Sequence, residues 1–288
     1  MFEWARRSIV ADTGRPDLDY ACKDTDLAGI KLPDSNVAVL LDIDGTLMDS
    51  VTSAEVVVVD DGLRGLVGDL HDAVDGALCL VTGRSLRQVD EIFGDLELPT
   101  FGLFGLERRV ARHGTNEISS TPPSLPAATH EVIERLKTHA GLIFQPKGAV
   151  FAVDTRFALA AKPDVEQALA AALPVAGDDY MVIIGHRVCE LAPKRALKGK
   201  AIEALMNVAP FRGRVPLFIG DDAPDESGFE VVNGMGGISI RVNPQGPTAA
   251  RYTMQGTAEV RLYLESLLKQ CRNRRSEGVS AVKEGLAR

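Results

Sequence analysis

Carboxylates gather at the ends of two apolar runs, residues 37–43 and 215–219. Clustered carboxylates repel one another unless a cation compensates them, and oxygen ligands with room for water suit Mg²⁺. A metal ion there would also screen the repulsion between an anionic nucleophile and an anionic phosphate. These segments therefore predict a magnesium site beside a nucleophilic aspartate. The residues concerned are Asp42, Asp44, Asp221, Asp222 and Asp225.

A hydroxyl and a lysine complete the candidate set. Thr82-Gly83-Arg84 follows another apolar run, residues 77–81, and Lys198 opens a predicted helix. Thr82 and loop N–H groups can hold phosphate oxygens, while Lys198 neutralises charge on both nucleophile and phosphate. An aspartate can attack phosphorus and form a covalent intermediate, which divides hydrolysis into two steps. A second carboxylate two residues on can protonate the leaving oxygen and then deprotonate water.

Buried parallel strands are expected to position these residues. Unbroken apolar runs are typical of strands buried on both faces, and helical spacing of apolar residues follows or precedes each run. This alternation predicts an α/β fold with a doubly wound parallel sheet, in which ligands bind at the carboxyl ends of the strands. The expected strands are 37–43, 77–81, 215–219 and 237–242, and the expected helices are 61–74, 85–93, 198–207 and 259–269.

A smaller α+β unit interrupts this pattern, and the parallel pattern resumes after it. We therefore expect residues 106–193 to form an inserted cap, which begins with an alternating strand at 107–113. Residues 36–105 and 194–271 are expected to form the core. We interpret residues 1–35 as a loosely attached leader, and the polar tail 272–288 as disordered.

Bulk properties exclude several classes of protein. The formal net charge of -8 argues against general nucleic-acid binding. No run approaches the length of a membrane span, and the N-terminus has no apolar stretch long enough for a signal peptide, so we expect a cytoplasmic protein. The 4 cysteines are widely spread and indicate neither a zinc site nor a disulfide framework.

The motifs resemble the four signature motifs of the haloacid-dehalogenase-like (HAD) phosphatases: Asp42-x-Asp44-Gly45-Thr46, Thr82, Lys198 and Gly220-Asp221-Asp222 with Asp225. The resemblance implies a Rossmannoid core, with Asp42 as the nucleophile and Asp44 as the general acid/base. It implies that Mg²⁺ is held by Asp42, the backbone carbonyl of Asp44, and Asp221. Supporting residues of the metal and phosphate site would be Gly45, Gly83, Arg84, Asp222 and Asp225.

A narrower resemblance, over about residues 37–268, is to the trehalose-6-phosphate phosphatases. It is carried by Thr82-Gly-Arg84, Lys198-Gly199 with Ala201, Gly220-Asp-Asp-x-x-Asp-Glu226-x-x-Phe229 and Gly236-Gly237. The resemblance implies hydrolysis of trehalose 6-phosphate with Mg²⁺ and functional coupling to a trehalose-phosphate synthase. It also implies sugar contacts from the cap residues Glu107, Arg109, Lys147, Arg156 and Glu190.

Departures from that family lie mostly in the cap. Phe104 stands where histidine is common, Gln145 where glutamate is common, Asp154-Thr155 where His-Tyr is common, and Pro224 replaces a threonine. A phosphatase that acts on another sugar phosphate, of the sucrose 6-phosphate or glucosylglycerol phosphate type, therefore remains an alternative function. Two further alternatives are a phosphosugar-binding module without turnover and a phosphomutase that returns the phosphoryl group to the sugar.

Overall fold

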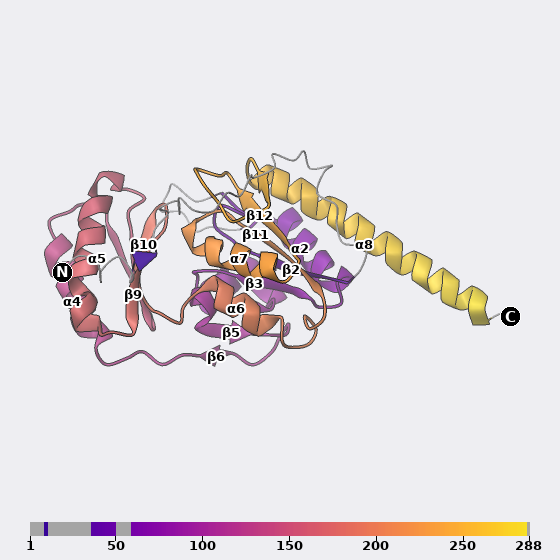
Figure 1. Ribbon diagram of the computed structural model, residues 1–288, viewed down its shortest axis with the longest axis horizontal. Helices are drawn as coiled ribbons and strands as arrows, with labels where there is room; N and C mark the ends of the chain where they lie inside the picture. Colours follow the sequence, from indigo (N-terminus) through magenta and orange to yellow (C-terminus); the bar gives the residue numbers. More distant parts are fainter. Residues whose placement is uncertain (1–8, 11–35, 50–58, 287–288) are drawn as a thin grey trace.

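The computed structural model describes residues 9–10, 36–49 and 59–286. Its larger unit is built on an eight-stranded sheet in the order β13-β12-β11-β2-β3-β4-β5-β6 (Figure 1). The strands from β13 to β4 run parallel, and β5 and β6 extend the sheet antiparallel. The strands are β2 Val37–Leu41, β3 Leu78–Val81, β4 Thr100–Gly102, β5 Glu107–Arg109, β6 Glu117–Ile118, β11 Val215–Gly220, β12 Ile238–Val242 and β13 Tyr252–Met254.

Helices cover both faces of this core sheet. Helix α2 joins β2 to β3, and α7 joins β11 to β12 in the opposite direction along the sheet. Right-handed crossovers in opposite directions place their helices on opposite faces. Accordingly α2 packs with α8, and α6 packs with α7. The helices are α2 Asp61–Ala73, α3 Leu86–Phe93, α6 Lys198–Leu205, α7 Glu226–Gly234 and α8 Thr257–Leu286, with short 3-10 turns at η2 Gly94–Leu96, η3 Leu103–Gly105 and η5 Ala223–Asp225.

The apolar runs form the strands that their composition predicts. All five residues of β2 are buried, as are all four of β3. Because β2 lies at the centre of the sheet, both of its faces are covered, which explains why the run does not alternate with polar residues. The predicted α/β fold with a doubly wound parallel sheet is confirmed.

The cap is a second unit with its own core. Its sheet has the order β1-β9-β10-β8-β7. Two helices cover the face of this sheet that points away from the larger unit (Figure 1), and their apolar side chains pack on the sheet in a separate hydrophobic cluster. The elements are β1 Ile9–Val10, β7 Ile143–Lys147, β8 Val150–Asp154, β9 Tyr180–Ile184, β10 Val188–Pro193, α4 Leu125–Leu136, α5 Lys162–Ala176 and η4 Leu159–Ala161.

A third cluster joins the two units. Leu103 and Phe104, in the core turn after β4, pack in one cluster with residues of the cap sheet, among them Val150 and Ile183. Both turn residues have positive φ, 46° and 57°, which is unusual for large side chains. Their N–H groups donate to the carbonyls of Arg84 and Thr82, and these bonds hold the turn in place. The junction thus lies directly beside the Thr82 loop.

The first strand assigned to the cap belongs instead to the core sheet. Glu107–Arg109 pairs antiparallel with β4 and with β6. The alternation of residues 107–113 does predict a strand, but it contains no information about the sheet that the strand joins. The location of this segment within the cap was therefore wrong, and this affects the roles expected of Glu107 and Arg109.

Both chain ends are more ordered than expected where the structure describes them. Ile9–Val10 pairs parallel with Val182 and Ile183 of β9, so part of the leader belongs to the cap sheet; the remaining leader residues lie outside the described ones. The expectation of a disordered tail was wrong up to Leu286, because α8 continues to that residue and projects beyond the body (Figure 1). Helix propagation needs no new nucleus, and Arg272 ties this helix to Asp69 of α2 at 2.9 Å.

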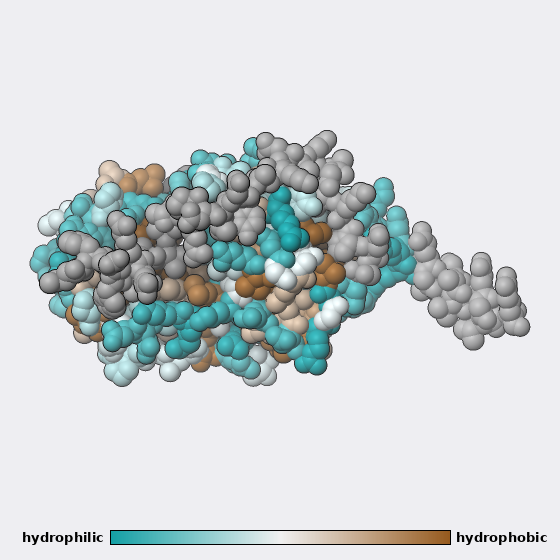
Figure 2. Space-filling view, viewed as in Figure 1, coloured by the Kyte–Doolittle hydropathy of each residue, from teal (hydrophilic) through white to brown (hydrophobic). Residues whose placement is uncertain are grey.

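The visible face of the molecule is mostly hydrophilic (Figure 2). Figure 2 shows hydrophilic residues over most of the described part of the visible face, with apolar residues in small separate patches. Among the described residues, no helix is both long and apolar enough to cross a bilayer.

Candidate active site

The predicted residues meet at one edge of the core sheet. Asp42 directly follows β2, Thr82 follows β3, and Asp221 follows β11. Because these strands are parallel neighbours, their carboxyl ends lie side by side. Lys198, the first residue of α6, reaches the same edge. The structure thus brings together residues that are up to 179 positions apart in the sequence, from Asp42 to Asp221.

A buried lysine links two of the carboxylates. Lys198 Nζ donates to Asp42 Oδ1 and to Asp225 Oδ1, each at 2.6 Å. The three residues are between 0% and 5% exposed. Burial raises the pKa of Asp42 to about 7, although Lys198 acts in the opposite direction. Burial by itself would lower the pKa of Lys198, but Asp225 and Asp42 raise it above its ordinary value, so this lysine stays charged.

The carboxylates outnumber the positive charge that faces them. Carboxylate oxygens of Asp42, Asp221 and Asp225 lie within 4.8 Å of one another. Burial, followed by Asp42 and Asp225, raises the pKa of Asp221. A Cβ on Gly45 would lie 1.9 Å from Asp221 Oδ2, so only glycine leaves room for that carboxylate. This set of hard oxygen donors around a small space fits Mg²⁺.

Asp225 braces the loop that carries these ligands. Its Oδ2 accepts from the backbone N–H groups of Asp221 and Asp222, at 3.1 and 3.0 Å. Since its Oδ1 already accepts from Lys198, both oxygens are engaged by the protein. Asp225 therefore orients Asp221 and Lys198, as a supporting residue would.

The other carboxylate of the first motif faces an arginine. Arg84 donates to both oxygens of Asp44, each at 2.6 Å. Thr82 Oγ1 accepts from the backbone N–H of Arg84 at 3.2 Å, which fixes the short loop between them. A bidentate pair of this kind fixes the orientation of a carboxylate. Asp44 is thereby held at the entrance of the site, next to the buried nucleophile candidate.

A polar cleft of about 700 Å³ lies between core and cap above Asp42. Lys147 and Glu190 of the cap line it and form an ion pair at 3.2 Å. Lys147 also donates to the carbonyl of Gly83 at 3.4 Å, across the boundary between the two units. Burial raises the pKa of Glu190, and Lys147 opposes that effect. Arg156 lines the same cleft and binds Asp154.

Comparison with known proteins decides the family. A family model described as trehalose-phosphatase matches residues 40–258. The chain belongs to this family. It is 37% identical over 214 residues to a probable trehalose-phosphate phosphatase of Sinorhizobium fredii, covering 74% of this chain and 80% of the relative. It is 34% identical over 251 residues to a trehalose-6-phosphate phosphatase of Escherichia coli, covering 86% and 92%.

Solved structures share the fold. The C-terminal domain of the Candida albicans trehalose-6-phosphate phosphatase superposes with a TM-score of 0.68 at 18% identity, covering 81% of this chain and 92% of that chain. Phosphatases of the HAD superfamily also share it, which confirms the core-and-cap fold class. As a member of the trehalose-phosphatase family, the chain is a phosphoric monoester hydrolase.

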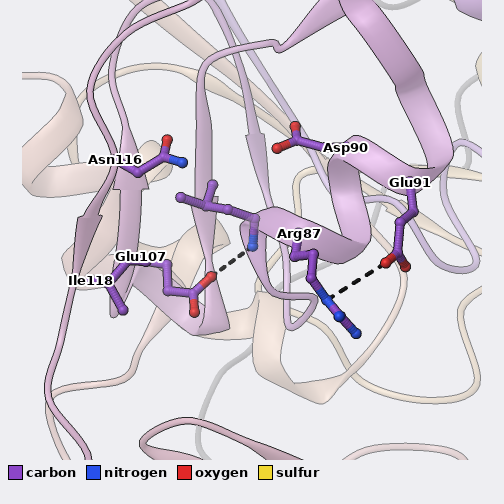
Figure 3. A pocket seen from close by; sticks show the side chains of 7 residues that line it. Arg87, Asp90, Glu91, Glu107, Asn116 and Ile118 are labelled. Carbon is purple, nitrogen blue, oxygen red and sulfur yellow. Dashed lines mark hydrogen bonds and ion pairs between the residues drawn. The ribbon is translucent and has the colours of Figure 1, made fainter.

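Two residues that the family resemblance assigned to sugar binding face other groups. Glu107 Oε2 accepts from the backbone N–H of Leu86 at 2.7 Å, at the start of α3 (Figure 3). Arg109 is 2% exposed and donates to both carboxylate oxygens of Asp90, at 3.0 and 2.6 Å. Neither lines the cleft. In this structure they attach α3 to the antiparallel edge of the core sheet.

Other cleft residues were not selected from the sequence. His186 and Arg187 lie in the turn between β9 and β10, and Asn243 and Gln245 follow β12. Asn243 could have been recognised, because it stands at the carboxyl end of a predicted parallel strand. The turn residues offered no such signal, since their position depends on how the cap sits on the core.

Proposed function

We propose that this trehalose-phosphatase family member hydrolyses trehalose 6-phosphate to trehalose and inorganic phosphate through an aspartyl-phosphate on Asp42. The observation that carries the proposal is the buried contact of Asp42 with Lys198 and Asp225, beside Asp221 and beneath a polar cleft. The names of the relatives support the substrate. Such a site combines a nucleophile, a fixed positive charge and a place for a cation.

In the first step a carboxylate oxygen of Asp42 attacks phosphorus, and the bond from phosphorus to the sugar oxygen breaks. Asp44 gives its proton to the leaving oxygen, so the sugar departs as a neutral hydroxyl. Thr82 and the backbone N–H of Gly83 hold phosphate oxygens, while Lys198 offsets the charge that gathers between nucleophile and phosphate.

In the second step Asp44 removes a proton from water, and the water oxygen attacks phosphorus. The bond from phosphorus to Asp42 breaks, which releases phosphate and regenerates both carboxyl groups. In the substrate-free protein both oxygens of Asp44 accept from Arg84. Asp44 must therefore leave Arg84 and take up a proton from water before it can act as the acid of the first step.

Asp42, Asp221 and the backbone carbonyl of Asp44 would hold Mg²⁺, with Asp225 in support. The bound ion would neutralise charge on the transferring phosphoryl group. We expect chelation with EDTA to abolish phosphate release and added Mg²⁺ to restore it.

Mg²⁺ is also expected to raise the melting temperature of the substrate-free protein. A ligand at a hundredfold excess over its Kd stabilises the folded state by about 2.7 kcal/mol. For a chain of this length, that corresponds to a rise in melting temperature of roughly 5 °C. Asp221→Asn should abolish this shift, and Asp95→Asn, at an exposed carboxylate, should preserve it. An equal shift in both variants would place the ion elsewhere.

The cap residues are expected to set the choice of sugar. Lys147→Met should lower kcat/KM for trehalose 6-phosphate about 100-fold, and should affect a small aryl phosphate far less. Glu190→Gln should act in the same direction, because the two side chains form one buried pair. Lys137→Met, at an exposed cap lysine, is the control. Equal losses on both substrates would mean that Lys147 does not contact the sugar.

The substrate itself is tested by a panel. Phosphate release with Mg²⁺ is measured from trehalose 6-phosphate, sucrose 6-phosphate, glucosylglycerol phosphate, glucose 6-phosphate and an aryl phosphate. A preference for trehalose 6-phosphate is expected. A different preference would mean that the divergent cap residues select another sugar phosphate. Binding without phosphate release would favour a binding module or a mutase. Coupling to a trehalose-phosphate synthase, which would supply this substrate, belongs to the same proposal.

A further inference from the structure

The tip of the cap touches the loop that carries the metal-ligand candidates. The turn between β9 and β10 contains Gly185, His186 and Arg187, and all three line the cleft. The backbone N–H of His186 donates to Asp222 Oδ2 at 2.7 Å. This hydrogen bond joins the cap directly to the residue after Asp221.

Both oxygens of Asp222 are engaged by backbone N–H groups. While Oδ2 accepts from His186, Oδ1 accepts from Ala223 at 2.8 Å. The backbone N–H of Asp222 in turn donates to Asp225, so the carboxylate is fixed relative to the core. Asp222 is also absent from the group of three close carboxylates. Its contacts therefore point to the cap rather than to a cation.

The cap side of the contact is shaped to allow this approach. A Cβ on Gly185 would lie 2.6 Å from Asp222 Oδ2 and 3.0 Å from the carbonyl of Val188. Gly185 is not in the left-handed region, so the close approach, and not backbone strain, requires glycine here. A larger residue would force the turn away from Asp222.

We propose that Asp222 is a positioning residue that fastens the β9–β10 turn to the core and so holds the cap closed over a sugar phosphate. This role rests on the proposed function, and it differs from the metal-supporting role implied by the family resemblance. Together with the contact from Lys147 to Gly83, the bond fixes the cap at two core loops beside Asp42. It also sets the place of His186 and Arg187 in the cleft.

The expected effect is a selective loss on substrates that need the cap. Hydrogen bonds to a charged acceptor are among the stronger ones in proteins. Losing this bond should therefore shift the equilibrium between the closed and the open cap about tenfold or more toward the open cap. Gly185→Ala should lower kcat/KM for trehalose 6-phosphate by about that factor and leave turnover of a small aryl phosphate within about twofold. Asp222→Ala should likewise lower kcat/KM for trehalose 6-phosphate relative to kcat/KM for the aryl phosphate.

Two measurements without substrate separate this role from a metal role. In Asp222→Ala the amide hydrogen of His186 should exchange about tenfold faster with solvent, as read by NMR. Mg²⁺ affinity, measured by calorimetry on the substrate-free protein, should stay unchanged in Gly185→Ala. In Asp222→Ala it should fall less than about tenfold, because a neighbouring charge is lost but no ligand is removed. Asp178→Ala, at an exposed cap carboxylate, is the control and should change none of these readouts.

Mg²⁺ binding weaker by more than about tenfold in Asp222→Ala, with wild-type sugar selectivity in Gly185→Ala, would overturn the proposal in favour of a metal role. Unchanged exchange at His186 would overturn it as well. If the wild-type protein hydrolyses no sugar phosphate, the proposed function fails on its own, and the exchange at His186 still decides whether the contact exists. Gly185→Ala supplies the test if Asp222→Ala does not fold.

Discussion

Asp42→Asn is expected to lower phosphate release at least about a thousandfold, the scale on which enzymes lose a nucleophile. An amide has nearly the same shape as a carboxylate but cannot attack phosphorus, so no covalent intermediate forms. The measurement is phosphate release with Mg²⁺ from trehalose 6-phosphate and from an aryl phosphate. Turnover of both substrates should fall equally, because both need this nucleophile whether or not they need the cap.

The fold of this variant is expected to survive. Burial already raises the pKa of Asp42 to about 7, which means that the folded protein holds a charged carboxylate there at a cost. Asn removes that charge, and Lys198 keeps its contact with Asp225. Circular dichroism and thermal unfolding should therefore match the wild-type protein. Wild-type activity in Asp42→Asn would remove the aspartyl-phosphate mechanism, whereas loss of folding would leave Asp42→Glu as the second test.

Lys198→Met should lose both activity and stability. Removing one partner of a buried ion pair leaves charge uncompensated and typically costs about 3–5 kcal/mol. Here Asp42 and Asp225 would face each other beside Asp221 without a cation. We expect a melting temperature about 6–9 °C lower without Mg²⁺, together with a loss of turnover of at least about a hundredfold.

The matched control is Lys200→Met, which changes an exposed lysine on the same helix. It should leave melting temperature and activity close to those of the wild-type protein. A small effect of Lys198→Met on both readouts would contradict the counter-charge role. In that case the assignment of the third motif would have to be reconsidered among the lysines near residue 198.

The sequence was sufficient to predict the core and the place where its candidate residues meet. Residues 37–41 form a strand because an unbroken apolar run can be buried only where both faces of a sheet are covered. Once such strands are parallel, their carboxyl ends must share an edge, so the proximity of Asp42, Thr82 and Asp221 follows from local patterns alone. Lys198 was predictable for the same reason, as the first residue of a helix that reaches this edge.

Only the tertiary structure decided which partners the remaining residues have. Glu107 and Arg109 lie on a strand, as their alternation indicates, but its pairing with β4 directs them to α3 and away from the cleft. The carboxylate of Asp222 was predicted beside the metal site, and the position of the cap gives it His186 as a partner. Local sequence sets the conformation of a segment, because backbone and side-chain preferences act between near neighbours. The partner across a sheet or between two units is chosen by contacts that exist only after the chain has folded.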